Sequence, residues 1–90
     1  MTTQTAPPAP TIDISVVHAA TSFNVAAATP GFGVEILFSR FQDLRTISGQ
    51  KTPDVLAGAS FASVLDAVLE CRTRGDRTFD VLAAIAKGKA

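Results

Sequence analysis

The segment Ser60–Gly75 reads SFASVLDAVLECRTRG and carries the densest apolar periodicity of the chain. Its large apolar side chains recur at the three- and four-residue spacing of one helix face. We predict that five of them form the structural core of the protein: Phe61, Val64, Leu65, Val68 and Leu69. Ser60 suits the N-cap of this helix, and Gly75 stands where a left-handed C-cap belongs.

A second amphipathic helix is predicted upstream of this segment. Apolar side chains again follow a helical spacing, and polar side chains take the opposite face. The apolar positions are Val34, Leu37, Phe38, Phe41 and Leu44. We expect Gly49 to end this helix and Thr52-Pro53-Asp54 to begin another, because proline suits the first helical position. A last short helix is expected from Thr78, with Phe79, Leu82 and Ile85 on its buried face.

The N-terminal part of the chain has almost no charge, since Asp13 and Glu35 are its only charged residues before Arg40. Residues 1–10 combine Thr, Gln and Ala with three prolines, which predicts a disordered leader. In residues 11–28 the alternation of Ile12, Ile14 and Val16 favours a strand, and Ser22–Ala28 would be its hairpin partner.

A helical reading of residues 11–28 stays open, because another set of apolar residues fits one helix face: Ile12, Val16, Ala19, Ala20 and Phe23. Proline and glycine predict a turn over Thr29–Gly33. The β-branched content of the segment favours the strand. We therefore expect an α+β fold that is mostly helical, with a strand-prone N-terminal segment, three helices and a single small domain over residues 11–90.

Composition excludes several classes of protein. The chain has 90 residues, a formal net charge of zero and one cysteine. Because basic and acidic side chains are equal in number, the protein has no net positive charge to attract nucleic acid, and no specific nucleic-acid binding is expected. A single cysteine forbids an internal disulfide and favours a reducing compartment. With no secretion signal and no apolar run of membrane-spanning length, the chain is expected to be cytoplasmic and not a membrane protein.

A family resemblance rests on Leu44–Gly49, Ala57-Gly58, Phe61-Ala62 and the run Arg72–Gly75. Over residues 34–85 the chain resembles the C-terminal tail of DDE transposases of bacterial insertion sequences. The resemblance implies that Glu35, twelve residues before Ile47, is a vestigial form of the third catalytic carboxylate of that family.

Activity does not follow from this resemblance. The Asn and Arg that flank the glutamate in the family are replaced here by Val34 and Ile36. Two-metal chemistry needs several converging carboxylates, and the 21 residues between Asp13 and Glu35 cannot hold the family's core strands. We expect no catalytic residue, no metal site and no cofactor.

Three further features have both a functional and a structural interpretation. His18 is the only histidine and lacks neighbours at metal-ligand spacing, so a structural role is expected. Cys71 lies on the margin of an apolar stripe, which favours packing over reactivity. A cluster at the start of the last helix could contact an anion or a partner, although neighbouring acids offset its charge: Arg72, Arg74 and Arg77.

The sequence therefore predicts a non-catalytic interaction or accessory protein. Apolar residues make up 47% of the chain, more than a domain of this size is expected to bury, so a protein partner or self-association is expected. In one hypothesis the chain is a mobile-element remnant that acts as an oligomer or accessory subunit. In the alternative, it is a small structural or accessory protein of a phage or larger assembly, and its apolar N-terminal segment adds a strand to a neighbour's sheet.

Overall fold

The fold is all-helical over the described residues. A computed structural model of the chain describes residues 12–52, 56 and 59–89. Four helices follow one another in this part of the chain: α1 Ile14–Ala27, α2 Val34–Lys51, α3 Phe61–Arg74 and α4 Val81–Lys89. No strand occurs in these residues, so the predicted α+β class is wrong. The expected leader, residues 1–10, lies outside the described residues.

Helix α1 occupies the segment that was predicted to form two strands. Asp13 is its N-cap, and the Asp13 carboxylate accepts a 2.8 Å hydrogen bond from the backbone N–H of Ser15. One face of the helix is buried, through Val16, Ala20, Phe23, Ala26 and Ala27. The strand prediction failed because the alternation of Ile12, Ile14 and Val16 does not match burial: Val16 is buried, whereas Ile14 is 66% exposed.

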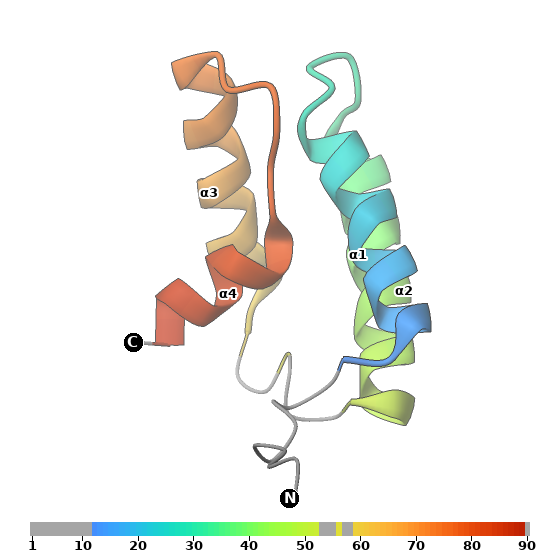
Figure 1. The fold of residues 1–90 in the computed structure, drawn as a ribbon. Helices are drawn as coiled ribbons and strands as arrows, with labels where there is room; N and C mark the ends of the chain where they lie inside the picture. Colours follow the sequence, from blue (N-terminus) through green and yellow to red (C-terminus); the bar gives the residue numbers. More distant parts are fainter. Residues whose placement is uncertain (1–11, 53–55, 57–58, 90) are drawn as a thin grey trace, which may run out of the picture.

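Helices α1 and α2 form an antiparallel pair (Figure 1), joined by the predicted turn after Thr29. The backbone N–H of Phe32 donates to the Thr29 carbonyl at 3.1 Å, which confirms that turn. Across the pair, the rings of Phe23 and Phe41 meet edge to face with centroids 6.1 Å apart. The buried face of α2 consists of Leu37, Phe41, Leu44 and Ser48.

Helix α2 continues past the predicted stop at Gly49 and ends at Lys51. Gly49 has a helical backbone without a positive φ, and glycine inside a helix costs only about 1 kcal/mol relative to alanine, so it need not end the helix. The backbone N–H of Thr52 donates to the Ser48 carbonyl at 2.8 Å and closes the last turn. The predicted helix start at Pro53-Asp54 lies outside the described residues.

Helix α3 begins and ends at the two predicted caps. The Ser60 hydroxyl accepts from the Ser63 N–H at 3.2 Å, and Gly75 is left-handed with φ of +77°. Val64, Val68 and Cys71 are buried, while Phe61 and Leu65 are partly buried against the core. Leu69, which the sequence placed among the core residues, is 47% exposed.

Helix α4 starts three residues later than the sequence suggested. The Asp80 carboxylate accepts hydrogen bonds from the backbone N–H groups of Leu82 and Ala83 in the first turn. The side-chain oxygen of Asn24, from α1, accepts from the Val81 N–H at 2.7 Å. Val81 and Ile85 are buried, and Phe79 and Leu82 pack against the core. Figure 1 shows α3 and α4 together on one side of the α1–α2 pair.

Candidate interaction surface

The predicted arginine cluster does not form one site, because Arg72 is used inside the fold. Its guanidinium donates three hydrogen bonds to carbonyls at the C-terminal end of α1: Ala26 at 2.9 Å, Ala27 at 2.9 Å and Thr29 at 3.0 Å. A cation at this position also offsets the partial negative charge of the helix end. Arg74 pairs with Glu70 one turn away, and Arg77 is exposed. Arg72 therefore ties α3 to α1 instead of facing a ligand.

Glu35 lies exposed in the first turn of α2, where its charge suits the helix N-terminus. Within the described residues, no group of three or more His, Cys, Asp or Glu side chains is placed to hold a metal ion. The carboxylate to which the transposase resemblance points therefore belongs to no such group in this part of the chain.

Cys71 is buried between α3 and the segment that follows it. Its thiol donates to the Thr78 carbonyl at 3.4 Å. Burial raises the pKa of the Cys71 thiol, and nearby Asp76 raises it further, while Arg72 and Arg74 act in the opposite direction. Because the thiolate is the reactive form, a raised pKa disfavours nucleophilic chemistry at this residue.

Cys71 is expected to react with an aromatic disulfide reagent at neutral pH at least roughly tenfold more slowly in the folded protein than in urea-unfolded protein, since burial limits both access and ionisation. The rate should rise with pH above the ordinary thiol range, because the raised pKa delays formation of the thiolate. Stopped-flow absorbance measures both rates. Equal rates in folded and unfolded protein would contradict the buried position of the thiol.

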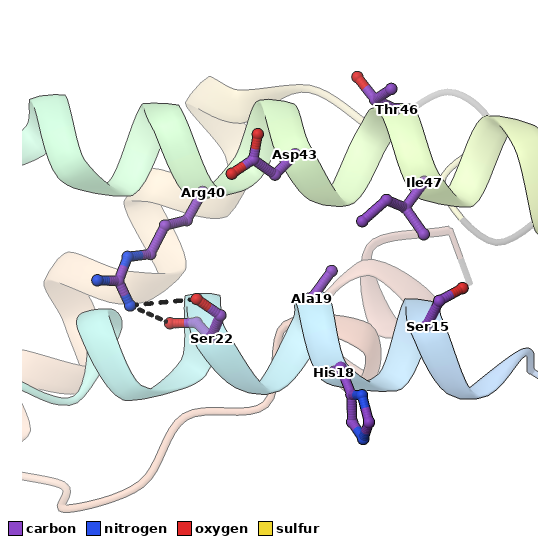
Figure 2. Close-up of a pocket in the computed structure, with 8 residues that line it drawn as sticks. All are labelled: Ser15, His18, Ala19, Ser22, Arg40, Asp43, Thr46 and Ile47. Carbon is purple, nitrogen blue, oxygen red and sulfur yellow. Dashed lines mark hydrogen bonds between the residues drawn. The ribbon is translucent and has the colours of Figure 1, made fainter.

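A groove of about 470 Å³ lies between α1 and α2. Arg40 of α2 spans it and donates to the Ser22 carbonyl at 3.0 Å and to the Ser22 hydroxyl at 3.2 Å. Figure 2 shows that the ring of His18 points away from α2, while Asp43 projects from α2 itself. An acid and a base therefore do not converge in this groove, and its geometry supports no catalytic pair.

The outward side of α1 exposes three large apolar side chains beside a histidine and a threonine, and it carries no Asp, Glu, Lys or Arg. We call it the α1 outer face and define it by Ile14, Val17, His18, Thr21 and Val25. Ile14 is 66% exposed, Val25 54% and Val17 38%. All fourteen residues of α1 lack an Asp, Glu, Lys or Arg side chain, whereas α2 and α3 carry charges along their exposed sides.

Sequence reasoning recognised that this segment is apolar but assigned it to strands, and so missed the face. The signal that could have revealed it is the absence of charge over four helical turns. A surface helix normally carries charged or polar residues opposite its buried stripe. The outward side of α1 has polar residues such as His18 and Thr21, but it also exposes Ile14, Val17 and Val25 and has no charged side chain.

No protein-family model matches the chain, and no curated protein or solved structure is significantly similar to it. Among the described residues, none of the helices combines the length and the apolar content needed to cross a membrane.

Proposed function

We propose that the chain is a non-catalytic interaction protein that binds a protein partner through the α1 outer face. The observation that carries the proposal is the exposure of Ile14, Val17 and Val25 on a helix with no charged residue. Burying a Val or Ile side chain contributes on the order of 1.5–3 kcal/mol when it was fully exposed. Three partly exposed side chains on one face therefore supply a driving force for association.

The proposed mode of binding is helix packing. Addition of a strand to a neighbour's sheet needs an extended segment, and residues 14–27 are helical with their backbone groups paired inside the helix. A partner would instead present an apolar groove or a second helix, into which side chains at helical spacing can insert. The apolar N-terminal segment remains the proposed binding element, but it binds as a helix and not as a strand.

Two biological settings agree with such a module, and both place it in the cytoplasm. The resemblance of residues 34–85 to transposase tails supports a mobile-element remnant, in which Glu35 would be a vestigial carboxylate. The uncharged α1 outer face supports a small accessory protein of a phage or other large assembly, because subunits of permanent complexes bury apolar faces. The zero net charge supports a protein partner over nucleic acid in either setting.

The test compares three forms of the protein by affinity purification from cells that naturally make it. The face variant is Val17→Lys with Val25→Lys, and the matched control is Gln42→Lys with Gln50→Lys, which adds the same charge at exposed positions of α2. The parent and the control are expected to retain the same proteins, and the face variant to lose them. Urea melts of all three forms establish that they fold. Retention of the same proteins by the face variant would overturn the proposal.

A further inference from the structure

We infer that α4 and the segment that leads into it open as one unit while α1, α2 and α3 stay folded. This unit, residues 75–89, is called the α4 cover. Its release exposes the thiol of Cys71, which is buried in the closed fold. The inference goes beyond the proposed function, because it concerns α4 and not the α1 outer face.

The thiol of Cys71 is covered by backbone that belongs to this unit. It donates to the Thr78 carbonyl at 3.4 Å, and the Asp76 carbonyl oxygen lies 4.0 Å from the sulfur. Both carbonyls belong to the connection between α3 and α4, which Figure 1 shows running back alongside α3. Because these groups follow Cys71 in the chain, the thiol becomes accessible when the connection moves away. Helix α3 itself does not have to unfold.

Helix α4 is short and depends on its contacts with the rest of the fold. Its nine residues are fewer than the roughly 12–15 that an isolated helix needs in water. It buries Val81 and Ile85, and Asn24 of α1 accepts from the Val81 N–H at 2.7 Å. In the connection before it, Phe79 packs against the core, whereas residues 75–78 and 80 are exposed. Loss of these few contacts releases the α4 cover.

The other three helices keep their own contacts when the α4 cover is released. The ring of Phe41 on α2 meets Phe23 of α1 and Phe61 of α3. The guanidinium of Arg72 on α3 still donates to the three carbonyls at the end of α1. Opening therefore costs less free energy than global unfolding, which must break both sets of contacts.

The experiment measures how fast an aromatic disulfide reagent labels Cys71 in native buffer. The reagent is kept dilute, so that the α4 cover closes many times before a reaction occurs, and the rate then reports the fraction of open molecules. Ile85→Ala removes a buried side chain of α4 and should raise the rate roughly tenfold or more. Asn24→Ala removes the hydrogen bond to α4 and should raise it about threefold to tenfold.

Ile47→Ala is the matched control, because it makes the same change on α2, where Ile47 packs against the core. It should lower the global stability measured by urea melts and leave the labelling rate within about twofold of the parent rate, since the contacts of α2 persist in the open state. In the parent, low urea should raise the labelling rate less steeply than it promotes global unfolding, because opening exposes less surface.

Three results would contradict the α4 cover. If Ile47→Ala raised the labelling rate by the factor by which it lowers global stability, Cys71 would be exposed only by complete unfolding. If Ile85→Ala and Asn24→Ala left the rate unchanged, the connection would move without α4. If circular dichroism showed that Ile85→Ala unfolds the whole chain, α4 would not separate from the other helices. Each of these results overturns the inference, whereas the expected pattern of rates supports it.

Discussion

Phe41→Ala is expected to lower the free energy of unfolding by about 3–5 kcal/mol, the usual cost of removing a buried phenylalanine ring. Phe41 is fully buried and joins three helices. Its ring contacts Phe23 of α1 with centroids 6.1 Å apart and Phe61 of α3 with centroids 5.5 Å apart. The guanidinium of Arg45 lies 4.9 Å from its centroid. A loss of this size would unfold much of a domain whose total stability is of similar magnitude.

Phe38→Ala is the matched control for this prediction, because it removes the same side chain from the same helix. Phe38 is 44% exposed and meets Phe61 edge to face at 5.1 Å. Its loss should cost about 1 kcal/mol, from one aromatic pair and part of one apolar surface. Urea melts of the parent and both variants measure the difference. If Phe38→Ala destabilised the protein as much as Phe41→Ala, the assignment of the α1–α2 interface as the centre of the core would be wrong.

Arg72→Ala is expected to destabilise the protein by about 2–3 kcal/mol, because it removes three hydrogen bonds from a charged donor. Ala26 and Ala27 are buried, so their carbonyl groups would lose partners that water replaces poorly. Arg72→Lys should recover only part of this loss, because one ammonium group cannot reproduce the forked contact of a guanidinium with several carbonyls.

Arg74→Ala provides the comparison within the same helix turn. Arg74 is exposed and pairs with Glu70 on the surface of α3, so its removal should change the unfolding free energy by less than about 0.5 kcal/mol. Thermal and urea melts of the three arginine variants test the difference. Equal effects of Arg72→Ala and Arg74→Ala would show that the bridge from α3 to α1 contributes nothing to stability.

Local sequence determined the helices whose ends carry their own signals. Ser60 and Gly75 delimit α3 in the structure as they do in the sequence, because a hydroxyl N-cap and a left-handed glycine act on backbone groups within a few residues. The apolar spacing of residues 34–44 likewise predicted α2, although the exposed Gly49 did not end it. Chain length and composition also predict a single small domain over residues 11–90, and this stays a prediction.

Two features were decided only by tertiary structure: the helical conformation of residues 14–27, and the hydrogen bonds of Arg72 to the end of α1. The β-branched residues of α1 favour a strand locally, but a helix places Val16, Ala20 and Phe23 together against the buried face of α2, and that burial outweighs local propensity. The contact of Arg72 with Ala27 crosses 45 positions in the sequence. A spacing rule cannot reveal such a contact, because it depends on where α3 lies relative to α1. The uncharged α1 outer face emerged for the same reason: which residues of a helix face solvent is set by the elements that pack against its other sides.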